Sequence, residues 1–328
     1  MTPAPERPVA SVVIAVFDGT ATLPAQLAAL AAQEDAPPFE VLVMDNNSTD
    51  DLAGTIAPFL GEKVRILPAR AHQGQCYARN LGALLARGEH VLFCDQDDVV
   101  SPTWVRALTD ELDAASVLAT GPMELARLNA EEVWRPDPGE DAPSLLRPYP
   151  VQGYLPFVYG SNLGMRREDF IALGGFDNSY RGGDEDTDIS WRAQEAGHPI
   201  AVSEDAVVHY RLRSGARALF RQHRGYARTR TITVLRTQGT RPLRGMSLKW
   251  TLGHLALAPR DWLRVRGTHA GRLEWARRTG GLVGNLEGQL RYRGGRTPEP
   301  ELIDRARPEA LEHRAAAART GGAPDVQG

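Results

Sequence analysis

The stretch from Val91 to Asp98 constrains the fold of this 328-residue chain more than any other. Four apolar residues run directly into a cluster of three carboxylates, and a turn signal, Ser101-Pro102, follows. An apolar run that a turn bounds is typical of a buried strand in a mostly parallel sheet. The carboxylates then lie at the carboxyl edge of that sheet, where open α/β sheets bind their ligands.

The rest of the first half alternates apolar strands with helical patterns. This alternation predicts βαβ units, and therefore an α/β fold with a mostly parallel sheet and helices on both faces. The predicted strands are 11–17, 39–44, 64–67, 91–94, 159–166 and 200–209, and the predicted helices are 23–32, 76–86, 167–172 and 185–193. The proline- and acid-rich text from 135 to 150 predicts a loop or an insertion.

Several classes of protein are disfavoured. Cys76 and Cys94 are the only cysteines, so neither a disulfide framework nor a thiolate zinc site is available, and a reducing, cytoplasmic setting is expected. The apolar run 9–17 lacks a basic start and a cleavage site, so we interpret it as a strand rather than a signal peptide. No run reaches the roughly 18 apolar residues of a membrane span. Neither G-x-G-x-x-G nor a Walker A phosphate loop occurs.

Charge divides the chain unevenly. Residues 1–210 carry 14 basic and 32 acidic side chains, whereas 211–296 carry 20 basic and 3 acidic ones. We therefore predict a domain at 1–212, a basic helical region at 213–296 and a flexible tail at 297–328. Trp250, Trp262 and their neighbouring arginines suit a helix lying on an anionic membrane surface, at the inner face of the cell membrane. A helical cap packed on the first domain is the alternative, and no recognition module for nucleic acid is legible.

Four polar clusters stand at predicted strand ends or helix starts. They are Asp45, Asp95 to Asp98, Glu185 to Asp188, and His209. The ends of parallel strands share one edge, so the sequence predicts an acidic cleft with candidate bases and one imidazole. Oxygen ligands favour Mg²⁺ or Mn²⁺, which is most useful beside a diphosphate. Taken singly, each cluster also has a structural interpretation, as a solvated acidic turn, a capping residue or a buried histidine.

An ordered series of motifs makes residues 9–212 resemble the family 2 glycosyltransferases, inverting nucleotide-sugar enzymes of the GT-A fold. The matching segments are 12–18, 43–50, Gly74 with 78–82, 93–98, 160–162, 174–177, 183–188 and 208–210. A lone D-x-D motif is weak evidence, but this series places each element where the fold would need it. The resemblance implies a sugar transfer from a nucleoside diphosphate, in which UDP, dTDP and GDP all stay open, to a glycan, lipid-linked or small-molecule acceptor.

The resemblance also implies roles for individual residues. The donor-binding residues would be Ala15, Phe17, Asp45, Arg79 and Asp95; the metal ligands Asp97 and His209; and the catalytic pair Glu185 and Asp186. Asp186 would be the general base, kept ionised by its place near a helix start. The cofactor would be Mn²⁺ or Mg²⁺. Because the Q-x-x-R-W motif of processive synthases is absent, a single transfer per encounter is expected.

Two other hypotheses remain open from the sequence. A sugar-1-phosphate nucleotidyltransferase would need a glycine- and arginine-rich loop after the first strand, where this chain has Asp18-Gly19-Thr20. The other hypothesis is a non-catalytic, membrane-associated scaffold of the same fold. The carboxylates at all three acidic sites are intact, which argues against it. Ala15 and Asp18 also depart from the proline and asparagine that many relatives carry in this first motif.

Overall fold

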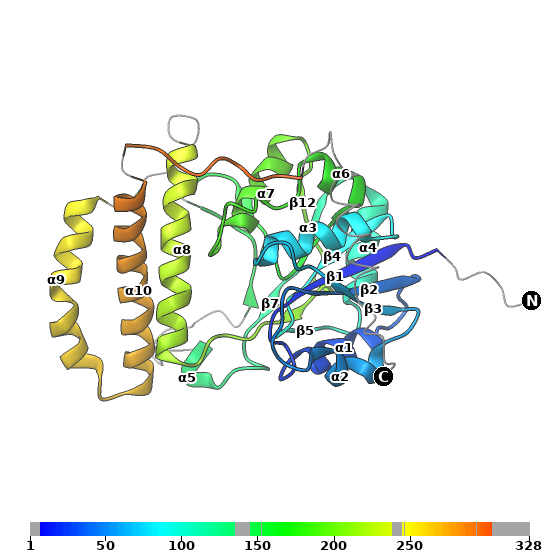
Figure 1. Cartoon of the computed structure of the whole chain (residues 1–328), viewed down its shortest axis with the longest axis horizontal. Helices are drawn as coiled ribbons and strands as arrows, with labels where there is room; N and C mark the ends of the chain where they lie inside the picture. Colours follow the sequence, from blue (N-terminus) through cyan, green and yellow to red (C-terminus); the bar gives the residue numbers. More distant parts are fainter. Residues whose placement is uncertain are drawn as a thin grey trace, which may run out of the picture.

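The structure is a computed structural model that describes residues 7–134, 145–151, 153–237, 245, 247–292 and 294–303. A sheet with helices on both faces forms one side of the molecule, and a set of long helices forms the other (Figure 1). Among the helices described, none combines the length and the hydropathy that a membrane-crossing helix needs.

The central sheet has seven strands. Across the sheet they are β12 (Ile200–Val202), β6 (Leu118–Thr120), β11 (Leu163–Arg166), β4 (His90–Phe93), β1 (Ala10–Val16), β2 (Phe39–Asp45) and β3 (Val64–Pro68). Only β11 runs antiparallel to its neighbours, so the predicted α/β fold with a mostly parallel sheet is confirmed. Val16 lies opposite Asp45 and Val13 opposite Phe93, so β1, β2 and β4 end at the same edge.

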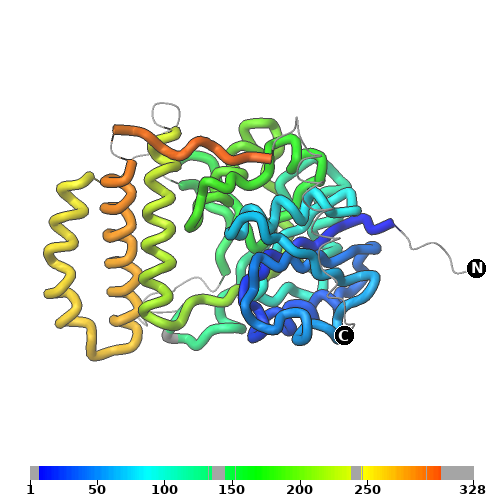
Figure 2. The backbone as a smooth tube through the Cα atoms, in the orientation of Figure 1, coloured from blue at the N-terminus to red at the C-terminus, as the bar shows by residue number. Residues whose placement is uncertain are grey.

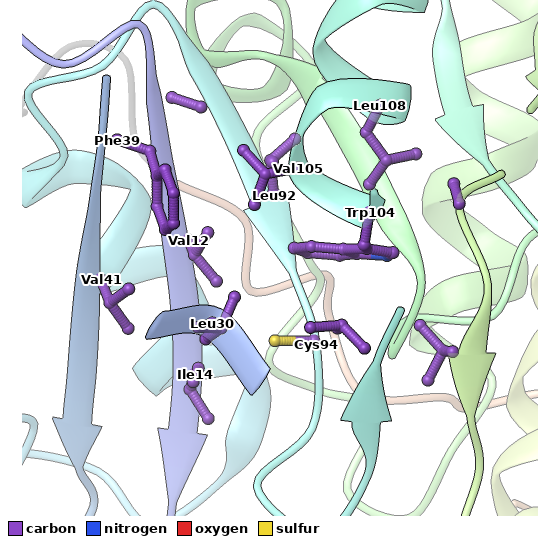
Figure 3. Close-up of a cluster of buried hydrophobic side chains, with 14 of the residues drawn as sticks. Val12, Ile14, Leu30, Phe39, Val41, Leu92, Cys94, Trp104, Val105 and Leu108 are labelled. Atoms are coloured by element: carbon purple, nitrogen blue, oxygen red, sulfur yellow. The ribbon is translucent and has the colours of Figure 1, made fainter. Parts of the chain in front are cut away.

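Alternating strand residues build a separate core on each face of the sheet. One face is covered by α1 (Leu23–Ala31), α2 (Leu52–Ile56) and α4 (Trp104–Ala114), the other by α3 (Gln75–Leu85), α6 (Arg167–Ala172) and α7 (Glu185–Glu195). In the first core, Trp104 lies beside Leu92 and Leu108, with Val12 and Ile14 of β1 farther along (Figure 3). Burial on both faces explains why the strands are continuous apolar runs.

The predicted strand 200–209 is wrong. A turn in which the Ala206 amide donates to the Ser203 carbonyl (3.1 Å) divides it into β12 and β13 (Val208–His209). β13 joins a second sheet of four strands, with β5 (Val99–Val100), β7 (Met123–Glu124) and β8 (Leu145–Leu146). His209 therefore lies in the second sheet, where it pairs with Val99, the residue that follows the Asp95 to Asp98 cluster.

The predicted strand 159–166 starts only at β11, because a turn from Tyr159 to Asn162 precedes it. A short hairpin-like pair, β9 (Tyr149–Pro150) and β10 (Pro156–Phe157), lies upstream of that turn. Of these two strands, β9 lies at the end of the segment 135–150, where a loop or an insertion was predicted. Residues 135–144 of that segment lie outside the described residues.

Three long helices form the basic region: α8 (Ala216–Arg236), α9 (Leu248–Val265) and α10 (His269–Arg291). α8 lies against the sheet domain, α10 packs on α8, and α9 is outermost (Figure 1). Glycines allow the close approach of α10 to α8, since a Cβ at Gly284 would lie 2.1 Å from the Arg224 carbonyl oxygen. The helix α9 contains Pro259 and continues through it to Val265.

The chain then returns to the sheet domain. Residues 294–303 run from the end of α10 across α8 toward α7 (Figure 2). There the Ile303 amide donates to the Gly174 carbonyl (2.7 Å) and the Asn178 amide to the Glu301 carbonyl (3.0 Å). Residues 297–303 of the predicted tail are thus bonded to the first domain, and residues 304–328 lie outside the described part of the chain.

Candidate active site

A small pocket of about 240 Å³ opens at the carboxyl edge of β1 and β4. Ala15, Phe17, Asp95 and Asp97 all line it, so the structure brings these four predicted residues together. Phe17 is 47% exposed and therefore has a free ring face for a planar ligand. This arrangement is typical of a nucleotide pocket at a strand edge.

Asp45 lies at this edge but not in the pocket wall. Its Oδ1 accepts a hydrogen bond from the Ser48 amide (3.0 Å), and Arg70 approaches its Oδ2 at 4.0 Å. The next residue, Asn46, does line the pocket. Its side chain is buried; it donates to the His72 carbonyl (2.8 Å) and accepts from the Gly74 amide (2.7 Å), which fixes the loop before α3. From the sequence, Asn46 could be predicted only as a turn residue and not as part of the pocket wall.

Arg79 on α3 joins the two acidic clusters. Its guanidinium is buried, with Nη2 at 2.5 Å from Asp95 Oδ1 and Nη1 at 3.8 Å from Glu185 Oε1. Burial acts to lower the pKa of Arg79, but the charges of Asp95 and Glu185 raise it overall. Arg79 therefore stays protonated and holds the D-x-D loop against the start of α7.

Two arginines after β13 hold the other end of the D-x-D loop. Arg213 Nη1 lies 2.8 Å from Asp97 Oδ2, and the Arg211 amide donates to Asp98 Oδ1 at 2.8 Å. Burial and the neighbouring charge of Asp95 raise the pKa of both Asp97 and Asp98. The contact of Arg213 with Asp97 could not be predicted from the sequence, which shows only that the segment of Arg213 is basic.

The carboxylate pair fits a divalent cation in part. Asp95 and Asp97 share the pocket wall, and their mutual repulsion shows that the site needs positive charge, which Arg79 and Arg213 supply here. Mg²⁺ is commonly held by one or two carboxylates together with substrate phosphates, and Asp95 and Asp97 meet that pattern. Among the described residues, no group of three His, Cys, Asp or Glu side chains is gathered to hold a metal.

His209 lies apart from this pair. Its Nδ1 is 2.9 Å from Glu124 Oε2 and its Nε2 is 2.8 Å from Arg127 Nη1. Neither ring nitrogen is directed at Asp97, and His209 is absent from the walls of the pocket. A metal-ligating role for His209 therefore stays a prediction that requires Arg127 to leave Nε2.

Glu185 and Asp186 open helix α7 and line a second, larger cavity of about 1550 Å³, which Asp95 and Asp97 also line. Burial raises the pKa of Asp186, and burial together with the charge of Asp186 raises the pKa of Glu185 to about 7. Burial thus outweighs the helix start, which was expected to keep Asp186 fully ionised. A raised pKa suits a general base, because it lies closer to the working pH.

The two carboxylates differ in their freedom. Glu185 Oε1 accepts a hydrogen bond from Gln75 Nε2 at 2.5 Å and faces Arg79. Asp186 Oδ1 accepts from the Thr187 amide (2.8 Å), whereas its contact with the Gly160 amide is long, at 3.4 Å. Asp186 Oδ2 therefore has only this long contact, while Glu185 Oε2 is buried without a hydrogen-bond partner among the described residues.

Helix α8 holds the residue before this pair. Asp184 is a buried residue in the left-handed region (φ 74°), paired with Arg230 at 2.9 Å and accepting from the Thr233 hydroxyl at 2.6 Å. Burial raises the pKa of Asp184 to about 6, while Arg230 opposes that shift. Helix α8 thus packs on the first domain, as the alternative of a helical cap predicted. The contact between Arg230 and Asp184 was not predicted, because the sequence shows Arg230 only as part of a basic segment.

The sequence also matches known proteins. The pattern described as Glycosyl transferase family 2 matches residues 11–174, half of the chain, and the one described as N-terminal domain of galactosyltransferase matches 147–212. Succinoglycan biosynthesis protein ExoO of Rhizobium meliloti is 27% identical over 62% of this chain and 61% of its own length. Validoxylamine A glucosyltransferase of Streptomyces hygroscopicus is 26% identical over 61% of this chain and 51% of its own length. The chain thus spans about half to three fifths of these two relatives.

A crystal structure of GalNAc-T7 with UDP, GalNAc and Mn²⁺ shares the fold, with a TM-score of 0.51 and 16% identity over 76% of this chain and 55% of that one. The family match covers the chain from β1 to β11, the D-x-D loop, and every residue of the small pocket except Arg213. The chain therefore belongs to glycosyl transferase family 2 and has the family's GT-A fold.

Proposed function

We propose that this protein is an inverting glycosyltransferase that moves a sugar from a nucleoside diphosphate to an acceptor hydroxyl, one transfer at a time. One observation carries the proposal. The D-x-D carboxylates Asp95 and Asp97 line both the nucleotide-sized pocket and the larger cavity that contains Asp186. A donor and an acceptor placed in these adjoining spaces would meet between the two sets of carboxylates.

In the proposed reaction, Asp186 accepts the proton of the acceptor hydroxyl while that oxygen attacks the anomeric carbon. The bond to the diphosphate breaks on the opposite face, so the anomeric configuration inverts. Glu185, held by Gln75 and Arg79, keeps Asp186 in position. Arg213, half exposed and lining both spaces, is placed to bind the diphosphate oxygens once it leaves Asp97.

A divalent cation on Asp95 and Asp97 would neutralise charge on the departing diphosphate. The UDP and Mn²⁺ in the GalNAc-T7 structure make them the first ligands to test. We expect Mn²⁺ with a nucleoside diphosphate or its sugar to raise the melting temperature, because a ligand that binds only the folded state stabilises it. At a concentration of 100 times Kd the gain is about 2.7 kcal/mol.

Asp97→Ala should remove the Mn²⁺-dependent part of that stabilisation, since Asp97 supplies a pocket-lining carboxylate. Asp110→Ala is the matched control, because Asp110 is an exposed carboxylate (64%) on α4. Thermal shift with and without Mn²⁺ measures both. If wild type binds no common nucleotide, or if Asp97→Ala responds to Mn²⁺ as wild type does, the metal assignment is wrong.

We further propose that α9 holds the protein on an anionic membrane surface. Its outer side exposes Trp250 (45%), Leu252 (48%), Leu257 (46%) and Leu263 (64%). Lys249, Arg260 and Arg264 lie on the same exposed side. Within the described part of the chain α9 packs mainly on α10, and apolar and basic residues together on the outer side of such a helix are typical of an interfacial helix.

Leu257→Ser with Leu263→Ser should lower binding to vesicles that contain anionic lipid by at least about tenfold. Burying a leucine is worth about 1.5–3 kcal/mol, and 1.4 kcal/mol is a factor of ten. Co-sedimentation at low and high salt measures the effect. Leu60→Ser, at an exposed leucine (37%) on the first domain, is the control and should leave binding unchanged. Equal loss in both variants would contradict an α9 surface.

A further inference from the structure

The large cavity is lined by two chemically different groups of side chains. One group comprises the carboxylates of the D-x-D loop and the catalytic pair. The other is a group of apolar side chains from separate segments, which we call the apolar end: Leu125, Val133, Trp134, Leu146, Leu219 and Leu273. At about 1550 Å³ the cavity exceeds the roughly 300–1,000 Å³ of an ordinary ligand site, so it has room for more than a donor.

The apolar end is built from parts of the chain that are far apart in sequence. Val133 and Trp134 belong to α5 (Glu131–Trp134), which packs against α10, and Leu146 belongs to β8. Figure 1 shows α5 at the foot of α8 and α10. Leu273 on α10 is buried, at 5% exposure. The apolar end therefore lies between α5, β8, α8 and α10, with Leu125 and Leu273 buried and the other four side chains half-buried.

Helix α8 connects the two groups. Leu219, Gln222, His223, Tyr226 and Arg230 all line the cavity, and their spacing puts them on one face of the helix. From Leu219 to Arg230, which pairs with Asp184 beside the catalytic carboxylates, the helix rises about 16 Å. A ligand that fills the cavity from end to end is thus longer than a single sugar ring.

Aromatic rings also line the cavity. Tyr149, Phe157 and Tyr159 form consecutive edge-to-face contacts, and Tyr226 of α8 also lines the cavity. Such rings offer flat faces for the C–H side of a sugar. The charged pair on the α10 wall, Glu274 and Arg277, is internally neutral, with atoms 2.5 Å apart. The leucine-lined end, by contrast, offers little to a purely polar glycan.

We propose that the acceptor is an amphiphile, with a hydroxyl-bearing headgroup at Asp186 and an apolar chain in the leucine-lined end of the cavity. This inference rests on the proposed function, because it takes Asp186 as the group that meets the acceptor hydroxyl. It narrows the acceptor to molecules in which a sugar or similar headgroup is joined to a hydrocarbon chain. Each methylene that enters the apolar end should raise affinity about fourfold.

The test uses the full chain with methyl, hexyl, octyl and decyl β-D-glucopyranosides, each below its critical micelle concentration, and titration calorimetry. We expect affinity to rise about fourfold per added methylene in wild type. Leu219→Gln and Trp134→Ser should each flatten that dependence while binding of UDP with Mn²⁺ stays unchanged. Two variants are used so that the test survives if one of them does not fold.

Leu60→Gln, at an exposed leucine (37%) of the first domain, is the matched control and should keep the wild-type dependence on chain length, while Leu252→Gln tests the exposed side of α9. Equal affinity for the methyl and decyl glucosides in wild type would overturn the inference. So would a dependence that survives in Leu219→Gln and Trp134→Ser but is lost in Leu252→Gln, because the chain would then bind α9. Failure of UDP with Mn²⁺ to bind, alongside a normal chain-length dependence, would instead refute the proposed function alone.

Discussion

Asp186→Asn should lower kcat by roughly 10²–10⁴-fold and leave donor binding intact. A positioned general base contributes about that much to a rate, and the asparagine amide cannot accept the proton. Asparagine keeps the shape of the side chain and its contact with the Thr187 amide, so the start of α7 should stay in place. Turnover of the donor identified by thermal shift measures the rate, and titration calorimetry measures donor affinity.

The control for Asp186→Asn is Asp188→Asn, two residues further along the same helix. Asp188 pairs with Arg192 at 2.7 Å and does not line the cavity, so its loss should affect stability more than rate. A rate for Asp186→Asn within a few-fold of wild type would refute Asp186 as the base. Equal losses in both variants would show that disruption of α7, and not lost chemistry, lowers the rate.

The pH dependence gives an independent check. A base must be ionised to act, and burial raises the pKa of Asp186 while Glu185 titrates at about 7. The two groups interact, so the rate should fall as pH drops through an apparent value that belongs to the pair. That acid limb should lie between the ordinary carboxyl values and about 7. An acid limb at ordinary carboxyl values would contradict a buried base.

Hydrophobic runs and helix-start residues in the sequence predicted the strands and the helix start that depend on neighbouring residues alone. The strands that end at Asp45 and Asp95 were found because a strand buried on both faces must be a continuous apolar run. The start of α7 was found because carboxylates gather at helix starts. The error at 200–209 has the same origin: β12 and β13 are both apolar, and only their pairing partners, β6 and β5, show that they belong to different sheets.

The contacts that complete the site could not be found in this way. Arg213 meets Asp97 across 116 positions of sequence, and Arg230 meets Asp184 across 46. Such pairs depend on where whole helices pack, and the sequence shows them only as surplus basic charge. The same holds for the apolar end of the cavity, whose leucines come from separate segments that each look like ordinary core positions.

Arg79→Leu should lower the free energy of unfolding by about 3–5 kcal/mol, the second large effect we expect. Arg79 is buried between Asp95 and Glu185, and removal of the cation leaves the half-buried Asp95 and the buried Glu185 without their counter-charge. The loss of one member of a buried ion pair typically costs this much. Urea denaturation measures it as a lower midpoint with an unchanged slope.

Arg70→Leu is the control for Arg79→Leu. Arg70 is 71% exposed and lies 4.0 Å from Asp45, so its loss should lower the free energy of unfolding by less than about 1 kcal/mol.

The penalty in Arg79→Leu should also depend on pH in a defined direction. Glu185 already has a pKa raised from 4.5 to about 7, and removal of the Arg79 charge, which opposes that shift, should raise it further. A carboxyl whose pKa is higher in the folded state holds its proton there while the unfolded chain has lost it, so stability falls as pH rises. The penalty should therefore be smallest below pH 4.5 and grow through pH 7 and above. A penalty that is the same at pH 4 and pH 8 would show that Arg79 stabilises the fold by packing and not by its charge.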